Sequence, residues 1–213
     1  MKVLMLNGSP HQAGCTNRAL EEVAKTLAVA GVESEVFWVG ARPVGGCAAC
    51  NACSKLGRCA FGEKDGVNEF LAKAADADGF VFGAPVHYGR AGASLLGFMD
   101  RVFYANGRAG QPNVFAYKPA AAVTSARRAG TTSALADIEK YFTISQMPVV
   151  SSRYWNMVHG QSAEQVEQDE EGLWTMRQLG RNMAWLLRCV EAGRAAGVGL
   201  PEAEPGVWTN FVR

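Results

Sequence analysis

The chain has 213 residues and a mass of 22.8 kDa, a length that suits one α/β domain (1–213) and is short for two. Hydrophobic residues make up 48% and charged residues 19%, and the formal net charge is +1, so the composition gives no general attraction to nucleic acid or to an anionic membrane. We therefore expect no nucleic-acid partner and no membrane partner, and any recognition of anions has to be local.

The first stretch of the chain predicts a buried strand, a loop and a helix. The run from Lys2 to Asn7 is almost unbroken in its apolar character, as expected of a parallel strand covered on both faces, and it stops at Gly8. A helix is predicted beyond the loop, with Thr16 or Asn17 as its N-cap. Its apolar stripe consists of Leu20, Val23, Leu27 and Ala30. Backbone N–H groups and the positive end of the helix dipole then face one point, which favours a phosphate.

The loop from Gly8 to Asn17 differs from the common nucleotide-binding motifs. Gly8 and Gly14 are one residue too far apart for the Walker pattern, Cys15 stands where that pattern has lysine, and no G-x-G-x-x-G occurs in the loop. Turn chemistry alone also favours Gly, Ser and Thr between a strand and a helix. The loop by itself therefore leaves open whether it binds phosphate or only turns the chain.

Short apolar runs alternate with amphipathic stretches along the rest of the chain. Further strands are predicted at 34–39, 79–84, 120–124 and 147–150, and further helices at 67–74, 95–103, 135–142 and 172–197. The connection 40–65 is rich in Gly and carries four cysteines, the segment 154–172 is expected to be irregular, and the tail 199–213 is rich in Pro and Gly.

Five strands that alternate with helices predict an α/β fold with an open parallel sheet and helices on both faces. Ligands of such folds bind beyond the carboxyl ends of the strands. The loops after the first, third and fourth predicted strands, which begin at Gly8, Pro85 and Ser125, would all lie at that edge. Their convergence strengthens the phosphate hypothesis for the first loop.

The expected compartment follows from the N-terminus and the cysteines. No transmembrane span is predicted, and the first apolar run is interrupted at Asn7 too early for a signal peptide, so we expect a cytoplasmic protein. The cytoplasm is reducing. The six cysteines are therefore expected to be metal ligands, redox groups or buried apolar residues rather than structural disulfides.

Spaced motifs in the first part of the chain resemble one known family. They are Gly8-Ser9-Pro10, Thr16-Asn17, Pro85-Val86-His87-Tyr88-Gly89 and Ser125-Ala126-Arg127-Arg128-Ala129-Gly130. Together they resemble the flavodoxin-like NAD(P)H-dependent FMN reductases, and especially the iron–sulfur flavoproteins among them. The resemblance implies a flavodoxin-like doubly wound sheet of five parallel strands in the order 2-1-3-4-5, the order of flavodoxin itself. It also implies FMN as the cofactor and NAD(P)H as a co-substrate.

The resemblance further implies an FMN site built from these loops. The first loop would hold the phosphate, and the isoalloxazine ring would lie between the other two. The implied cofactor-binding residues are Ser9, His11, Cys15, Thr16, Asn17, Pro85, Val86, His87, Tyr88, Gly89, Ser125, Ala126, Arg127 and Gly130. His11 departs from the Arg or Lys expected at this position in many relatives, although a protonated imidazole could still serve the phosphate.

Two side-chain roles stay open at this point. Tyr88 either walls the flavin ring or belongs to the core. Arg127 and Arg128 either meet a phosphate of NAD(P)H or a substrate carboxylate, or they lie in a solvated loop. No protein side chain is expected to be catalytic, because the flavin supplies the chemistry.

The strongest compositional signal is a C-x2-C-x2-C-x5-C motif made of Cys47, Cys50, Cys53 and Cys59. Four thiolates on a Gly-rich loop can close around one metal centre, and they suit zinc or an iron–sulfur cluster. The resemblance to iron–sulfur flavoproteins implies a 4Fe-4S cluster near the flavin. The proline that usually follows the last cysteine in ferredoxins is replaced by Ala60, so zinc and an empty or redox-active thiol loop remain alternatives.

We expect an FMN-dependent oxidoreductase that transfers electrons from NAD(P)H to a quinone, a flavin or another small acceptor. The alternative is an iron–sulfur flavoprotein that carries electrons between a ferredoxin-like donor and an unknown acceptor. A receiver domain is disfavoured because Asn7 and Ala84 stand near positions that would need acidic residues, and a metallohydrolase because the three histidines lack metal-ligand spacing. The resemblance also implies a homodimer or homotetramer.

Overall fold

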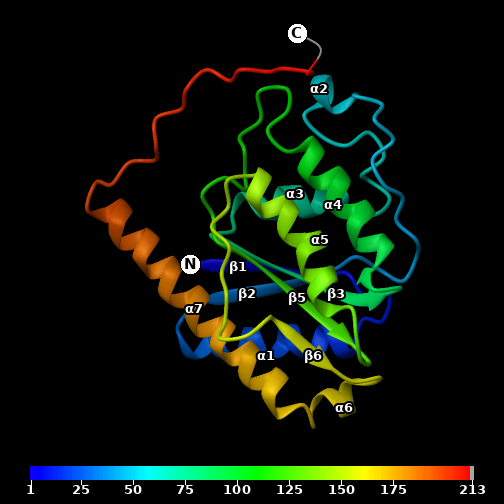
Figure 1. Cartoon of the computed structure of the whole chain (residues 1–213). Coiled ribbons are helices and arrows are strands. Elements are labelled where there is room, and N and C mark those ends of the chain that lie inside the picture. Colours follow the sequence, from blue (N-terminus) through cyan, green and yellow to red (C-terminus); the bar gives the residue numbers. More distant parts are fainter. Residues whose placement is uncertain (212–213) are drawn as a thin grey trace.

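A central parallel sheet organises the computed structural model, which describes residues 1–211 (Figure 1). The strands run in the order β2-β1-β3-β5-β6, and neighbours along this path are parallel. The two-residue strand β4 lies off this path and pairs antiparallel with β3. The strands are β1 (Lys2–Asn7), β2 (Glu33–Trp38), β3 (Gly79–His87), β4 (Arg90–Ala91), β5 (Ala120–Ala126) and β6 (Met157–His159).

The predicted parallel α/β architecture is confirmed. The predicted strand order 2-1-3-4-5 holds only in part, because the short strand β4 comes fourth along the chain but lies outside the path β2-β1-β3-β5-β6. The strand predicted at 147–150 is wrong. Val149 forms only an isolated bridge with Ala120, and Pro148 has no N–H to extend a ladder. The edge strand is instead β6, which pairs with the end of β5. β6 lies within the segment 154–172, which was expected to be irregular.

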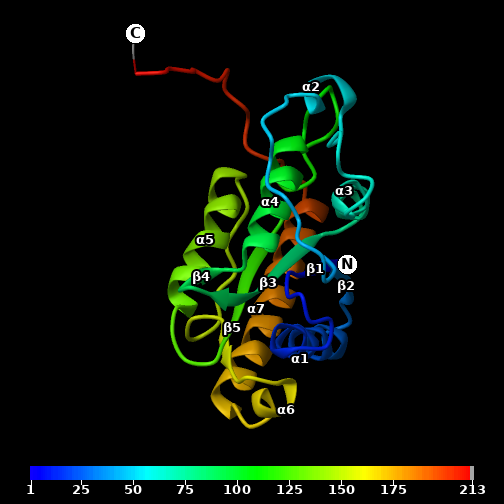
Figure 2. The same cartoon turned by 90° about the vertical axis from the view of Figure 1, so that its right-hand side faces the viewer.

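Helices cover both faces of the sheet (Figure 2). On one face pack α3 (Val67–Ala75), α4 (Ala93–Ala105) and α5 (Thr131–Ile144), and on the other α1 (Cys15–Val29) and α7 (Glu170–Ala195). The short α2 (Cys53–Leu56) belongs to the cysteine-bearing connection, and the short α6 (Ala163–Val166) precedes α7. Within residues 1–211, no helix has the length and apolar character needed to cross a membrane.

The alternation of side chains along the strands divides the core in two. Leu4 and Phe80 face α3, α4 and α5, whereas Val3 and Val81 face α1 and α7. Buried aromatic rings dominate the first half, and the burial of each contributes about 2 kcal/mol. They are Phe70, Phe80, Phe82, Phe98, Phe115 and Phe142. These two rigid layers fix the carboxyl ends of the strands, from which the candidate site is built.

Candidate functional site

The loop between β1 and α1 is held in shape by its own polar groups. The buried Asn7 side chain accepts a hydrogen bond from the Ser9 amide (3.0 Å) and donates one to the carbonyl of Gln12 (3.1 Å). The Ser9 hydroxyl accepts from the His11 amide (3.1 Å). At the end of β2, the Trp38 indole donates to the Ser9 carbonyl (2.8 Å). The loop is therefore a braced cradle.

The N-terminus of α1 opens into this cradle. The helix begins at Cys15 with Gly14 as its N-cap, so the predicted N-caps Thr16 and Asn17 are wrong and lie inside the first turn. In the part of the chain that the structure describes, no side chain caps this end and the first turn has no acidic residue. Backbone N–H groups and the helix dipole together bind anions at such an end. The loop thus has the chemistry for a phosphate, offered mainly by its backbone.

Two side chains that were predicted to contact the phosphate have internal partners. The hydroxyl groups of Thr16 and Ser125 lie 2.8 Å apart, and both residues are buried. The Asn17 amide accepts from Asn7 (3.4 Å) and donates to Glu21 (2.7 Å). Thr16 therefore ties α1 to the end of β5, and Asn17 braces the first loop.

Cys15 and His11 differ in their surroundings. The half-buried Cys15 thiol donates to the carbonyl of Gly160, just after β6 (3.5 Å), and burial raises the pKa of this thiol. A neutral thiol in this position joins two elements rather than offering charge to a ligand. His11 is exposed on the loop, and its carbonyl accepts from the Gly14 amide (3.3 Å).

A tight turn follows β3 at the same edge of the sheet. Tyr88 and Gly89 form it with φ angles of +49° and +74°. The Tyr88 side chain is fully exposed, so it does not belong to the core. Gly130, at φ +93° before α5, packs against this turn: a Cβ atom at Gly130 would lie 2.7 Å from the Cα of Gly89. The loops after β3 and β5 are therefore in contact, and their approach requires glycine.

The strand register completes the edge, because Pro85 of β3 pairs with Ser125 of β5. Pro85 and Val86 are half-buried, whereas His87 and Arg127 are exposed. The structure thus gathers at one edge the ends of β1, β3 and β5 with the predicted residues Ser9, His11, Cys15, Thr16, Asn17, Pro85, Val86, His87, Tyr88, Gly89, Ser125, Ala126, Arg127 and Gly130.

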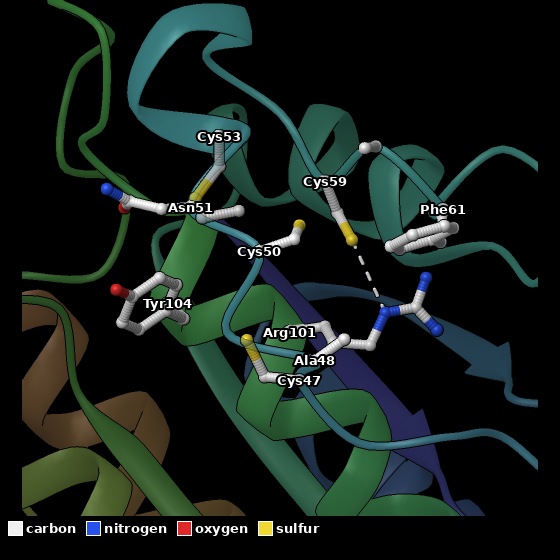
Figure 3. Close-up of a pocket in the computed structure, with 11 residues that line it drawn as sticks. Cys47, Ala48, Cys50, Asn51, Cys53, Cys59, Phe61, Arg101 and Tyr104 are labelled. Carbon is white, nitrogen blue, oxygen red and sulfur yellow. Dashed lines mark hydrogen bonds between the residues drawn. The ribbon is translucent and has the colours of Figure 1, made fainter.

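The four predicted metal ligands line a second pocket, over the C-terminal half of α4 (Figure 3). Cys47, Cys50, Cys53 and Cys59 are all free thiols, and Tyr104 and Arg101 share the pocket. As the side chains stand, residues 1–211 contain no group of three or more His, Cys, Asp or Glu arranged to hold a metal ion. The pocket therefore supplies the donor set without a preformed coordination sphere.

The backbone around Cys50 is strained. Ala49 and Asn51 on either side of it have φ angles of +50° and +55°, in the left-handed region that side chains disfavour by about 1 kcal/mol or more per residue. Such strain persists where the surroundings impose it, and it gathers at ligand-binding loops. The residues on both sides of Cys50 therefore adopt a conformation that a simple connection does not need.

The two candidate sites lie along one helix. Ala93 and Gly97 of α4 line a groove with His87 and Tyr88, whereas Arg101 lines the cysteine pocket. At a rise of about 1.5 Å per residue, Ala93 and Arg101 are separated by about 12 Å along α4. A cluster in the pocket would therefore sit further along α4 than the turn at Tyr88, rather than against that turn.

Sequence reasoning missed three residues that shape these sites. Asn7 and Trp38 each end a strand and brace the first loop, and a polar or indole group at the last position of an apolar run is the signal that could have found them. Arg101 is buried in the pocket, but it lies outside the apolar stripe of the predicted helix 95–103, so periodicity gave no signal for it.

Known proteins resemble this chain in sequence and in fold. An iron–sulfur flavoprotein of Methanocaldococcus jannaschii is 29% identical over 202 residues, which cover 90% of this chain and 100% of that protein. A flavone reductase superposes with a TM-score of 0.67 at 19% identity, covering 90% of this chain and 64% of that one. A flavodoxin from the domain Archaea gives 0.58 at 15% identity, covering 88% and 99%. The two structural matches show that the fold is flavodoxin-like.

The family is shown by a match of another kind. The family model described as NADPH-dependent FMN reductase matches residues 1–162, a stretch that contains all three loops of the candidate FMN site and the cysteine pocket. That stretch is more than half of the 213 residues. The chain therefore belongs to the NADPH-dependent FMN reductase family and is an FMN-dependent oxidoreductase.

Proposed function

We propose that this protein transfers electrons from NAD(P)H, through FMN bound at the carboxyl edge of the sheet, to a quinone, a flavin or another small acceptor. The observation that carries the proposal is the joining of three loops at that edge. The Thr16 hydroxyl lies 2.8 Å from that of Ser125, and Gly130 packs against Gly89. An anion-binding helix end, a braced loop and an exposed aromatic turn are thereby held together, as one mononucleotide requires.

The residues present fit FMN. The uncapped first turn of α1, beginning at Cys15, would hold the phosphate, with Ser9 and the exposed His11 beside it. The turn that carries Tyr88 and the loop that ends at Gly130 would hold the ring. The remaining proposed contacts are Thr16, Asn17, Pro85, Val86, His87, Gly89, Ser125, Ala126 and Arg127.

Each part of the chain then has a physical task. FMN supplies hydride acceptance and one- or two-electron transfer when it is bound. The turn at Tyr88 orients and shields the ring by offering an aromatic face. Arg127 and Arg128 are exposed and present guanidinium groups to a phosphate of NAD(P)H. No side chain of the protein has to act as a catalytic acid, base or nucleophile.

The second pocket is proposed to hold a 4Fe-4S cluster. Four thiols within one pocket form the donor set that such a cluster takes, and Cys50 lies between two residues with strained backbone, Ala49 and Asn51. Zinc, or a thiol loop with no metal, is the competing assignment. The ligands would be Cys47, Cys50, Cys53 and Cys59.

A second function is favoured by the same pocket. If the cluster receives electrons from a ferredoxin-like donor, the chain is an electron carrier to an unknown acceptor and needs no NAD(P)H. The exposed positions of Cys47 and Cys50 suit contact with a protein partner.

We also propose a cytoplasmic homodimer or homotetramer. The six free cysteines suit a reducing compartment. The exposed neighbours Tyr154 and Trp155, whose rings lie 4.9 Å apart, suit a subunit contact. Sedimentation analysis of the purified protein tests the assembly, and a monomer at micromolar concentration would contradict it.

One anaerobic experiment tests these functions. The protein is purified without oxygen, its absorption spectrum recorded, and released FMN, iron and acid-labile sulfide are assayed. The oxidised protein with its bound flavin is then mixed in a stopped-flow instrument with NADH, with NADPH or with reduced ferredoxin. Bleaching by a pyridine nucleotide supports the reductase, whereas bleaching only by ferredoxin supports the carrier. A protein that binds no FMN would overturn both.

A further inference from the structure

A buried arginine lies beside the cysteines. Arg101 of α4 is 5% exposed, and a buried cation is costly unless it is paired and hydrogen-bonded. Within residues 1–211, no other Lys or Arg side chain lines the cysteine pocket. The cost of placing this charge there requires an explanation.

The contacts of Arg101 aim one N–H group at a sulfur atom. Its two terminal nitrogens bind the Asp65 carboxylate, at 3.2 Å for Nη2 and by a shorter contact for Nη1. This planar two-pronged pairing fixes the guanidinium plane. The remaining Nε then donates to Sγ of Cys59 at 3.3 Å (Figure 3).

Cys59 is held in place independently of Arg101. The Asn68 side chain at the start of α3 binds both polar groups of the Cys59 backbone, accepting from its N–H and donating to its carbonyl, each at 3.0 Å. The Cys59 backbone therefore has two hydrogen bonds that do not involve the guanidinium. What Arg101 adds is a charge and a donor at the sulfur itself.

We propose that Arg101 sets the reduction potential of the cluster by donating a charged hydrogen bond to the Cys59 thiolate. This inference rests on the 4Fe-4S assignment proposed above. On reduction, the cluster takes up one electron from reduced flavin or from a ferredoxin-like donor, without a proton, and its net charge becomes more negative by one. A buried positive charge and an N–H group at a ligand sulfur stabilise the more negative state, so Arg101 raises the potential.

The test measures the midpoint potential by electron paramagnetic resonance during a mediated redox titration of the reconstituted full-length protein. The main variant is Arg101→Gln combined with Asp65→Asn, which removes both charges and leaves neither buried alone. Arg101→Lys keeps the positive charge but loses the planar, two-pronged pairing with Asp65. The matched control is Arg58→Gln, because Arg58 precedes Cys59, is exposed, and pairs with Glu63 outside the pocket.

The double variant should lower the reduced-to-oxidised ratio at a fixed potential severalfold, because the N–H donor at the sulfur is lost while the two removed charges partly offset each other; a tenfold change would be about 59 mV for a one-electron couple. Arg101→Lys should shift this ratio in the same direction by less, and Arg58→Gln should change the ratio little. Equal potentials in wild type and Arg101→Lys, or in wild type and the double variant, overturn the inference and leave the cluster assignment intact. Wild-type protein that gains no iron or sulfide on reconstitution overturns the cluster assignment, and this inference with it. If the double variant takes up no cluster, the comparison of the midpoint potentials of wild type and Arg101→Lys tests the inference by itself.

Discussion

The hydroxyl groups of Thr16 and Ser125 lie 2.8 Å apart and join the first turn of α1 to the end of β5. Both residues are buried, at 1% and 4% exposure, so water cannot replace either partner without rearrangement. This contact thus links the proposed phosphate cradle directly to the proposed ring-binding loop.

Thr16→Val should weaken both stability and FMN binding. The Ser125 hydroxyl would be left buried without its partner, at a cost of about 1–2 kcal/mol in the free energy of unfolding. The displaced loop should lower FMN affinity roughly tenfold, since each 1.4 kcal/mol is a factor of ten. Urea unfolding and fluorescence titration measure the two effects, and Thr132→Val, on the exposed side of α5, is the control. In a cycle with Ser125→Ala, strictly additive effects would contradict the contact.

Gly130→Ala should disrupt FMN binding more than Gly89→Ala does. Both residues have positive φ angles, +93° and +74°, so both substitutions strain the backbone by about 1–2 kcal/mol. Only the alanine at 130 would also collide, 2.7 Å from the Cα of Gly89, whereas a Cβ atom at Gly89 meets nothing within 4 Å. Comparison of FMN dissociation constants separates contact from strain. Equal losses in the two variants would show that the loops need not touch.

Thr124→Val should stabilise the apo protein. Thr124 is fully buried, and its hydroxyl has no hydrogen-bond partner among residues 1–211. Removal of an unsatisfied buried hydroxyl should raise the free energy of unfolding by about 1 kcal/mol. Thermal unfolding of the apo protein measures this change. Thr16→Val, whose hydroxyl has a partner, should move in the opposite direction, and a fall in both variants would argue against the assignment.

Glu22 should make stability depend on pH below the ordinary carboxyl range. Burial alone would raise the pKa of Glu22, but hydrogen bonds from Arg177 and Arg18 outweigh it and hold the pKa below its usual 4.5. A group with a depressed pKa in the fold stabilises it above pH 4.5 and loses that contribution as the pH falls through the folded pKa.

The variant Glu22→Gln should cost about 1–3 kcal/mol at pH 7 and flatten the acid limb of the stability profile. Denaturant unfolding between pH 7 and pH 3 measures it. Its neighbour Glu21→Gln, exposed on the same helix, serves as the control. An unchanged acid limb in Glu22→Gln would place the pH dependence elsewhere.

Periodicity predicted the layers of the fold but not the edge of the sheet. The central strands are continuous apolar runs, which local pattern alone identifies. The edge strand β6 has three residues inside a polar segment, and it exists because Met157 pairs with Thr124, far away in the sequence. Val149 and Val150 have strong β propensity, yet they form only one bridge beside Ala120. At these two residues, long-range pairing rather than local β propensity decided that no strand forms.

The candidate site was predictable as a set of loops and not as a set of contacts. Parallel strands end at one edge, so the polar loops after them had to converge. Which side chain meets which partner depends on register and burial. Thr16 was predicted to face a phosphate and faces Ser125, whereas Arg101 meets Cys59 across a separation of 42 residues. No local pattern contains that second pairing.

In the turn after β3, the residue that would be best for stability differs from the residue that the proposed function uses. Two consecutive positive φ angles, at Tyr88 and Gly89, make it a type I′ turn, in which Asn is far better suited than Tyr to the first position. The chain accepts strain of about 1 kcal/mol at its tip to keep an aromatic ring in solvent. Selection for thermal stability alone would therefore replace Tyr88 with Asn, and a more stable protein of that kind would have lost the large aromatic ring at the tip of this turn.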